Sequence, residues 1–280
     1  MSAAKPKADT GRVVDARMLK KELEKYLAKA FGKNSAMYNK MLGFELNKIK
    51  QQNSIHIPFI TRYLKKSMKG IKVLDIGCGT GGATVAWTLK GAECTGIDTS
   101  EDDLRIAAVR ARCEGVNAGF RKVKGTKLPF RNGTFDIIIC DQVLEHIPDF
   151  ERTISEMRRI IKKEGIVYVD LPNRFFPHDP HFNLFFMHWL PANAHKSIIR
   201  LFGRKYFDFP VFFRDYPSVK KAIVKNNFRI IAGSDEFIKG SRKKGLKYAA
   251  AKTLVSARIP ARFFSPTMQF ILEPIPRGRP

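Results

Sequence analysis

The chain has 280 residues, 44% of them hydrophobic, and carries a formal net charge of +25 at pH 7. This size allows one large domain or two small ones, with enough apolar residues for a buried core. The charge indicates an acidic partner (nucleic acid, anionic lipid headgroups or a phosphate-bearing substrate) without choosing among them. Four scattered cysteines with no CxxC pair argue against a disulfide framework or a zinc site, and favour a reduced, intracellular protein.

Neither a membrane-spanning helix nor a secretory leader is expected from the sequence. No apolar run reaches the roughly 18 residues that a spanning helix needs. Residues 2–11 are polar and basic and lack the apolar core of a signal peptide. We therefore expect a cytoplasmic protein that is soluble or peripheral to a membrane.

The first 69 residues are expected to form a basic helical extension of the main domain, which covers 70–280. Residues 1–11 are predicted to be disordered, whereas 14–64 have the period of a helix and many lysines. Beyond residue 70, short apolar runs alternate with helical segments. Strands are predicted at 71–79, 93–98, 119–123, 134–141, 166–170, 228–237 and 267–275, and helices at 82–91, 100–115, 149–165 and 218–227. This alternation predicts a doubly wound α/β fold around a parallel sheet.

A glycine turn follows the first predicted strand. The stretch "DIGCGTGG" has the GxGxxG spacing at Gly77, Gly79 and Gly82, which several nucleotide-binding folds share. Asp75 precedes the turn, where a carboxylate would repel a pyrophosphate and suit a ligand with positive charge, such as S-adenosylmethionine. Asp98 ends the second strand, where an acid accepts hydrogen bonds from ribose hydroxyls. The alternative is a glycine turn with a helix-capping acid and no ligand.

The segments "VLDIGCGTGG", "GIDTS" and "LPFRNGTFDIIICDQVLEHIPD" resemble the class I S-adenosylmethionine-dependent methyltransferases, in particular the type 11 group. That group includes quinone-biosynthesis and glycan-cluster methyltransferases. The resemblance covers about residues 70–172. It implies a Rossmann-like sheet of seven strands, one of them antiparallel, and S-adenosylmethionine as the cofactor. It does not specify the methyl acceptor.

The resemblance also implies which residues hold the cofactor. Asp75, Gly77 and Gly79 would hold the methionine end, and Asp98 the ribose. The usual acid after the third strand is absent from "VKGTKLPF", so the adenine would be held by backbone groups of Gly125 and Thr126. The full expected set is Asp75, Gly77, Cys78, Gly79, Asp98, Thr99, Gly125, Thr126 and Asp141.

Methyl transfer to a hydroxyl needs a base that removes the proton. His146, in "LEHIPD" just after the fourth strand, lies where the methyl group should point, and an unperturbed imidazole titrates near pH 6.5. Glu145 would orient it or contact the cofactor. The alternative is a histidine that only stabilises a turn. Quinone O-methyltransferases have a metal-binding ExxEH here, but Gln142 replaces the first acid, so no metal is expected.

Two insertions are expected, at about 171–217 and 238–265. The first, which contains "LPNRFFPHDPHFNLFFMHWLP", follows the fifth strand at the ligand edge of the sheet and is predicted to be the acceptor lid. The second is predicted to contain a basic amphipathic surface helix, because residues 239–262 hold eight Lys or Arg and no acid. The residues expected at the acceptor are His178, His181, Phe182, His188 and Trp189.

Aromatic rings and cations on one rim suit an apolar acceptor, such as a quinone or a lipid-linked glycan, at an anionic membrane. The same pairing suits RNA, through base stacking and phosphate contacts. The motifs of base methylation are absent, however: no double proline follows the fourth strand, and no proline precedes Cys140. The phenylalanines could also form the core of the lid itself. We expect O-methylation of a small or lipid-linked acceptor. The alternatives are an RNA methyltransferase and a non-catalytic assembly factor that binds S-adenosylmethionine.

Overall fold

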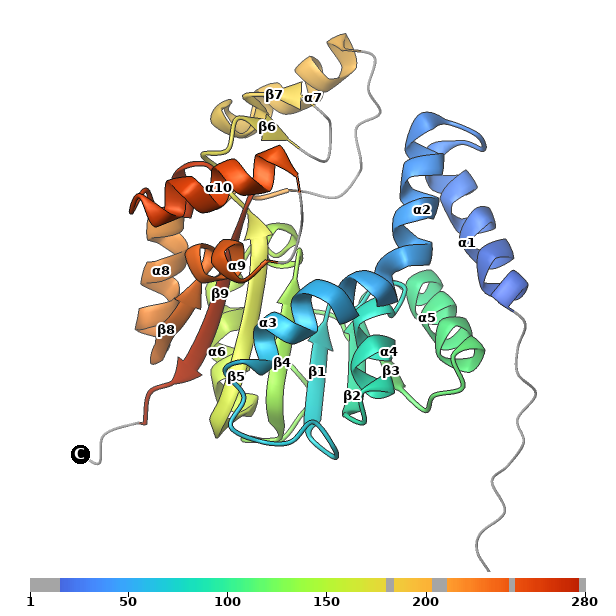
Figure 1. Ribbon diagram of the computed structural model, residues 1–280. Coiled ribbons are helices and arrows are strands. Elements are labelled where there is room, and N and C mark those ends of the chain that lie inside the picture. Colours follow the sequence, from blue (N-terminus) through green and yellow to red (C-terminus); the bar gives the residue numbers. More distant parts are fainter. Residues whose placement is uncertain (1–15, 180–183, 203–210, 242–244, 277–280) are drawn as a thin grey trace, which may run out of the picture.

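The computed structural model describes residues 16–179, 184–202, 211–241 and 245–276, so the disorder predicted for residues 1–11 lies outside the described ranges. A seven-stranded sheet runs through the protein, with helices on both faces (Figure 1). Its order is β3-β2-β1-β4-β5-β9-β8, and β9 runs antiparallel to both of its neighbours. The predicted α/β sheet with one antiparallel strand is therefore confirmed. The strands are β1 (Lys72–Ile76), β2 (Glu93–Asp98), β3 (Gly119–Lys122), β4 (Phe135–Asp141), β5 (Ile161–Pro172), β8 (Phe228–Gly233) and β9 (Thr267–Pro274).

Both faces of the sheet are buried, which explains why its central strands are continuous apolar runs. Successive residues of a strand point to opposite faces. Leu74 and Ile138 face one core, which α6 (Phe150–Ile160) and α8 (Tyr216–Lys225) cover. Val73 and Ile139 face the other core, which α3 (Ile57–Thr61), α4 (Gly82–Leu89) and α9 (Ser234–Gly240) cover.

The predicted boundary between the helix at 149–165 and the next strand is wrong by several residues. Helix α6 ends at Ile160, and β5 begins at Ile161, which pairs with Phe135 of β4. Lys162, expected in the helix, instead donates to the Asp136 carboxylate at 2.7 Å. Pairing with β4 and this partly buried ion pair thus override the local helical pattern of "IIKKEG".

The N-terminal segment packs on the domain as two helices. Helix α1 (Ala16–Phe31) is followed by Gly32, and Ser35 caps α2 (Ala36–Gln51) by accepting from the backbone amide of Tyr38 at 3.0 Å. Leu19 and Leu23 of α1 share a core with Ile106 of α5 (Glu101–Cys113). A turn of π-helix, η1 (Gln52–His56), joins α2 to α3. The predicted extension therefore lies against the glycine-turn half of the sheet.

Both predicted insertions lie beyond the sheet edge at which β4 and β5 end (Figure 1). The first contains a small hairpin, β6 (His178–Asp179) and β7 (Leu184–Phe185), followed by η3 (Met187–Trp189) and α7 (Ala192–Leu201). The second contains α10 (Leu246–Ser256), of which only Val255 is buried. The predicted helix lies at the surface, but its basic amphipathic character stays a prediction, because α10 holds only Lys247 and Lys252 of the eight cations, and Arg242, Lys243 and Lys244 lie outside the described residues. No helix in the described ranges combines the length and apolar character needed to cross a membrane.

Candidate cofactor and methyl-transfer site

The turn after β1 can be built only with glycine at two positions. Gly77 has a φ of 67°, and a Cβ there would lie 2.3 Å from a side-chain methyl of Val143. Gly81 has a φ of 78°, and a Cβ there would lie 2.6 Å from the Cβ of Ala107. The left-handed backbone and these close approaches both exclude larger residues. The turn thus brings its backbone close to the segment that follows β4.

A cavity of about 490 Å³ opens between this turn and the carboxyl ends of the strands. Its volume falls in the range of small-molecule sites, roughly 300–1,000 Å³. The turn contributes Gly77, the end of β2 contributes Asp98, and the segment after β4 contributes His146. The remaining lining residues are Tyr26, Ile76, Ile97, Thr99, Ser100, Asp103, Val123, Gly125, Thr126, Leu128, Gln142, Val143, Ile147 and Thr153. Residues far apart in the sequence therefore form one site.

Asp98 is held in place by the backbone around it. Its Oδ2 accepts from the amide of Gly79 at 2.8 Å, and its Oδ1 accepts from the amide of Ser100 at 3.0 Å. A carboxylate has about four lone-pair sites, so both oxygens can still accept from a ligand. Asp103 lies on the same wall, and two acids there disfavour a pyrophosphate. The residues present fit the ribose hydroxyls of S-adenosylmethionine.

Asp75 lies beneath the glycine turn and is not among the residues that line the cavity. It is buried, and its Oδ2 accepts from the amide and the hydroxyl of Thr84, at 3.0 and 2.6 Å. Burial raises the pKa of Asp75 to about 7. The carboxylate thus caps the start of α4, the role that the sequence left as the alternative. Contact between Asp75 and the methionine end of the cofactor stays a prediction.

The other predicted cofactor residues divide into two groups. Thr99, Gly125 and Thr126 line the cavity together with Gly77 and Asp98. Cys78 is buried behind the turn, against Gly96, while Gly79 binds Asp98 through its amide. Asp141 ends β4 but does not line the cavity. Only the first group is placed to touch a ligand in this cavity.

Tyr26 and Asp103 are among the cavity residues that were not predicted. Tyr26 of α1 lines the cavity and hydrogen-bonds to Asp103, an acid in the first turn of α5. Burial, followed by the charge of Asp103, raises the pKa of Tyr26. Tyr26 has the spacing of a residue on the packed face of an amphipathic helix. No local signal indicates that this face reaches a ligand site.

His146 and Glu145 form the end of a short 3-10 turn, η2 (Leu144–His146), and face different environments. The His146 side chain lies on the cavity wall and is 31% exposed. Glu145 is 1% exposed, and among the described residues neither of its carboxyl oxygens has a hydrogen-bond partner. Burial raises the pKa of Glu145 to about 8, which favours the protonated form near neutral pH. Its Oε1 lies 3.9 Å from Nε2 of His146.

A row of polar side chains crosses the sheet next to this turn. Asp141, Asp170 and Gln269 are register partners on β4, β5 and β9. Asp170 accepts from Nε2 of Gln142 at 2.9 Å and from Nε2 of Gln269 at 3.1 Å. Burial, with the charge of Asp141, raises the pKa of Asp170 to about 8. The side-chain amide of Gln142 thus donates to this buried carboxyl.

His56 of η1 covers this row and was not predicted. Its Nδ1 lies 3.3 Å from the Tyr168 hydroxyl and 3.9 Å from Oδ2 of Asp141. Within the described ranges, no three His, Cys, Asp or Glu side chains gather as metal ligands would. The absence of a metal stays a prediction.

Two of the five predicted acceptor residues have described side chains. His178 packs edge-on against Phe185 at 5.1 Å, and Trp189 is 53% exposed and packs against Phe186 at 4.9 Å. His181, Phe182 and the side chain of His188 lie outside the described residues. The alternative in which the phenylalanines form the core of the lid is wrong for Phe185 and Phe186, which are 67% and 50% exposed. Met187 and Ile199 form that core.

Comparisons with known proteins agree with the fold of the domain. A family model described as a methyltransferase domain, of the type 11 group, matches residues 74–169. A ubiquinone biosynthesis O-methyltransferase from Chromobacterium violaceum is 34% identical over 131 residues, which cover 46% of this chain and 56% of the relative. The same-named protein of Methylococcus capsulatus is also 34% identical over 131 residues, 54% of its length. The chain thus spans about half the length of the curated relatives it matches.

Solved structures show the same fold. A SAM-dependent methyltransferase from Methanosarcina mazei has a TM-score of 0.54 at 21% identity, over 78% of this chain and 97% of that one. Geranyl diphosphate methyltransferase in complex with SAM has a TM-score of 0.54 at 16% identity, over 86% of this chain and 92% of that one.

The sheet order, the glycine turn and the cavity define a class I S-adenosylmethionine-dependent methyltransferase domain. Within that class, residues 74–169 match the methyltransferase domain of the type 11 group, and the cofactor that this site fits is S-adenosylmethionine.

Proposed function

We propose that the chain transfers a methyl group from S-adenosylmethionine to a hydroxyl of a small or lipid-linked acceptor, such as a quinone-like phenol or a lipid-linked glycan, at a membrane surface. The observation that carries the proposal is the position of His146. It is a histidine on the wall of the cofactor cavity, just beyond β4. Several relatives are named ubiquinone biosynthesis O-methyltransferases, which supports oxygen as the methylated atom.

The chemistry follows from the groups around the cavity. The bound cofactor supplies an electrophilic methyl group on a sulfonium. Asp98 and the backbone near Gly125 and Thr126 bind the nucleoside part and fix its orientation. His146 would accept the proton of the acceptor hydroxyl as the hydroxyl oxygen takes up the methyl group, and the cofactor, which would supply that group, would leave as the neutral thioether. The Glu145 carboxyl lies 3.9 Å from the His146 ring, and burial raises its pKa to about 8, which favours the uncharged form beside the base.

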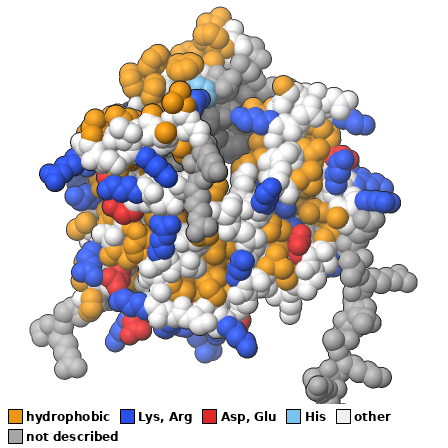
Figure 2. Space-filling view, viewed as in Figure 1, with side chains coloured by type: hydrophobic (Ala, Val, Ile, Leu, Met, Phe, Trp, Pro, Cys, Tyr) orange, Lys and Arg blue, Asp and Glu red, His pale blue; other side chains and the backbone are white. Residues whose placement is uncertain are grey.

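A membrane surface is proposed from the composition of residues 184–202, which form an exposed aromatic rim. Hydrophobic side chains gather on the upper part of the protein, over the elements from β6 to α7 (Figure 2). Phe185, Phe186, Trp189 and Leu201 are each at least half exposed. Residues 184–202 contain Lys196 and Arg200 and no Asp or Glu. Aromatic rings partition into the headgroup zone, and each cation near an anionic surface contributes about 1 kcal/mol.

RNA methylation is the second candidate, because aromatic stacking and phosphate contacts would use the same rim. A non-catalytic assembly factor that binds S-adenosylmethionine would use the same cavity without His146. The rim favours the membrane, since its exposed side chains include Leu201 at 82% exposure, which offers no ring for base stacking.

The test is transfer of labelled methyl from S-adenosylmethionine to phenolic amphiphiles in anionic vesicles, with wild type and His146→Ala compared. The variant should bind the cofactor as the wild type does and turn over roughly 10²–10⁴ times more slowly. Turnover within a factor of about three of the wild type would make His146 a structural residue. Label in RNA but not in amphiphiles would favour the second candidate.

A further inference from the structure

The loop that carries His146 is held from one side by a single arginine, Arg214. One guanidinium nitrogen of Arg214 donates to the carbonyl of Ile147 at 3.0 Å and to that of Pro148 at 3.1 Å. These are the two residues directly after His146. The guanidinium also lies 4.4 Å from the ring centre of Phe150 and 5.2 Å from that of Phe212.

The backbone beside Arg214 makes a second contact with the same loop. The amide of Phe212 donates to the carbonyl of Glu145 at 2.6 Å. The segment at 211–214 therefore contacts the residues on both sides of His146, through one backbone bond and one side chain. Arg214 does not line the cofactor cavity, so it reaches the chemistry only through this loop.

Arg214 also joins this loop to the exposed aromatic rim. The amide of Arg174 donates to the carbonyl of Arg214 at 3.1 Å, and Asn173 forms a parallel bridge with Arg214. The indole N–H of Trp189 in turn donates to the carbonyl of Arg174 at 3.1 Å. A continuous path of hydrogen bonds thus runs from Trp189, which is half exposed, to the residues that follow His146.

No acidic side chain is needed to explain the position of Arg214. Two carbonyl oxygens and two ring faces hold the guanidinium, and burial lowers its pKa. Its Nε is buried without a hydrogen-bond partner in the described part of the chain. A lysine would keep the charge but lose the planar group that stacks between two rings while donating to two carbonyls.

We infer that Arg214 is a positioning residue for His146 and that it couples the aromatic rim at Trp189 to the methyl-transfer site. The inference rests on the proposed function, because it assigns Arg214 to a reaction in which His146 is the base. A displacement of a base by about 1 Å can cost about a hundredfold in rate. We therefore expect that breaking the hydrogen bond from the Trp189 indole to Arg174 lowers turnover and leaves cofactor affinity unchanged.

The test compares Arg214→Lys, Trp189→Phe and the double variant. Trp189→Phe keeps a ring at the rim and removes only the N–H donor to Arg174. Arg214→Lys should lower kcat about tenfold or more and leave the KM for S-adenosylmethionine within a factor of two. Trp189→Phe should lower kcat a few-fold, and the double variant should be no slower than Arg214→Lys, because both changes break the same path. If the fold-loss of kcat in the double variant equals the product of the two single losses, the coupling is refuted.

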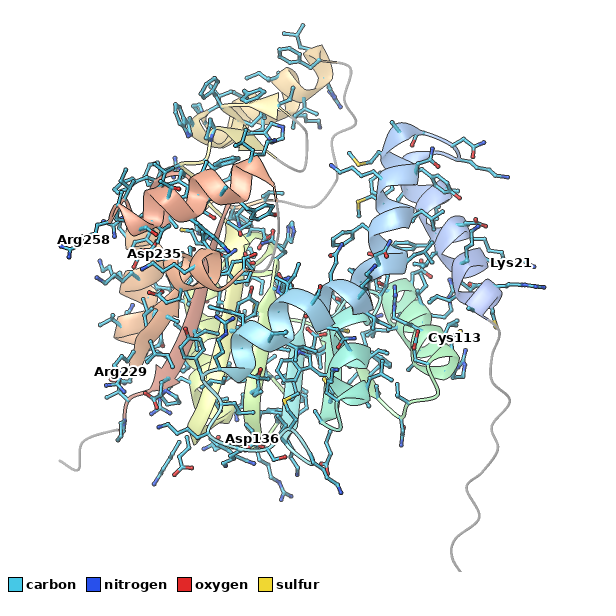
Figure 3. All side chains as sticks on the ribbon, viewed as in Figure 1. Lys21, Cys113, Asp136, Arg229, Asp235 and Arg258 are labelled. Carbon is cyan, nitrogen blue, oxygen red and sulfur yellow. The ribbon has the colours of Figure 1, made fainter. Side chains whose placement is uncertain are left out.

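A spectroscopic readout separates this inference from the proposed function. The ring resonances of His146, assigned with a His146→Gln variant, should move in Arg214→Lys bound to S-adenosylhomocysteine, even if no acceptor has been found. The matched control is Arg229→Lys, an exposed arginine on β8 paired with Glu273, well away from the insertions (Figure 3). If Arg214→Lys is unstable, Phe212→Leu removes one stacking face and should shift the same resonances less. Unmoved His146 resonances in both variants would refute the positioning role.

Discussion

Arg110 of α5 and Glu45 of α2 form a buried ion pair directly behind the glycine turn. The guanidinium lies 3.0 Å from the Glu45 carboxylate, with the two side chains 1% and 7% exposed. Arg110 also donates to the backbone and hydroxyl oxygens of Thr80, at 2.8 and 3.1 Å. Lys48 adds a second cation 2.7 Å from Glu45. The N-terminal helices are thereby bonded to the turn that forms the cofactor site.

Loss of Arg110 should be costly because it leaves the Glu45 carboxylate buried with less compensation. Arg110→Met is expected to lower the free energy of unfolding by about 3 kcal/mol in denaturant titrations. Arg105→Met is the control. Arg105 lies on the same helix as Arg110 and pairs at the surface with Glu22 of α1, so its replacement should lower the free energy of unfolding by less than about 1 kcal/mol. Adding Glu45→Leu to Arg110→Met should recover at least half of the loss. An equal cost for Arg105 and Arg110 would contradict this account.

Cofactor affinity should depend on Asp98. Asp98→Ala is expected to weaken binding of S-adenosylmethionine by about 1–3 kcal/mol in calorimetry, because ribose hydroxyls and two backbone amides lose their acceptor. Asp102→Ala, in the exposed first turn of α5, should leave binding unchanged. Nicotinamide dinucleotides should not bind. Dinucleotide binding, or an Asp98→Ala variant with wild-type affinity, would count against the assigned cavity.

Glu145 should make the protein less stable as the pH rises. Its ordinary pKa of 4.5 applies to the unfolded chain, and burial raises the folded-state pKa to about 8. The folded chain therefore binds this proton more tightly, and stability is lost as the pH rises from about 4.5 through 8. Glu145→Gln should gain stability relative to the wild type over this range, by at most about 1.4 kcal/mol per pH unit.

Denaturant unfolding at pH 5, 7 and 9 measures this difference. Glu164→Gln, at an exposed position of β5, is the control and should show no trend with pH. A Glu145→Gln difference that stays constant from pH 5 to pH 9 would mean that Glu145 is ionised in the folded protein.

Co-sedimentation with anionic vesicles should distinguish a membrane from RNA. Changing Phe185, Phe186 and Trp189 together to serine should abolish vesicle binding even at low salt, because the interface loses its apolar contacts. An RNA complex would keep its phosphate contacts and weaken only partly. Changing the cations Lys196, Arg200 and Lys247 to glutamine should also reduce vesicle binding strongly.

The control for the charge changes uses lysines at the opposite edge of the sheet. Lys69, Lys90 and Lys163 are exposed near the amino ends of β1, β2 and β5, where Asp136 is labelled in Figure 3. Their replacement by glutamine removes the same net charge and should leave vesicle binding nearly intact. Tight RNA retention with no vesicle binding would reverse the proposed order of the two partners.

Local patterns in the sequence were enough to predict the sheet and part of the site. A strand buried on both faces must be a short apolar run, and a left-handed turn must contain glycine, so β1 and Gly77 have direct signatures. Asp98 and His146 follow strands whose carboxyl ends meet at one edge of a parallel sheet. Their presence in one cavity therefore follows from the topology that the pattern implies.

Long-range packing decided what the sequence pattern left open. Glu45 and Arg110 are 65 residues apart, and Tyr26 reaches the cavity only because α1 packs on α5. Long-range packing also decided three other features. Asp75 caps a helix, Glu145 is buried, and Arg214 hydrogen-bonds to the loop after His146. Hydrophobic period specifies which face of an element is buried. Which helix or strand packs against that face is decided only in the assembled fold. These packing partners set the charge state, orientation and hydrogen bonds of each functional group.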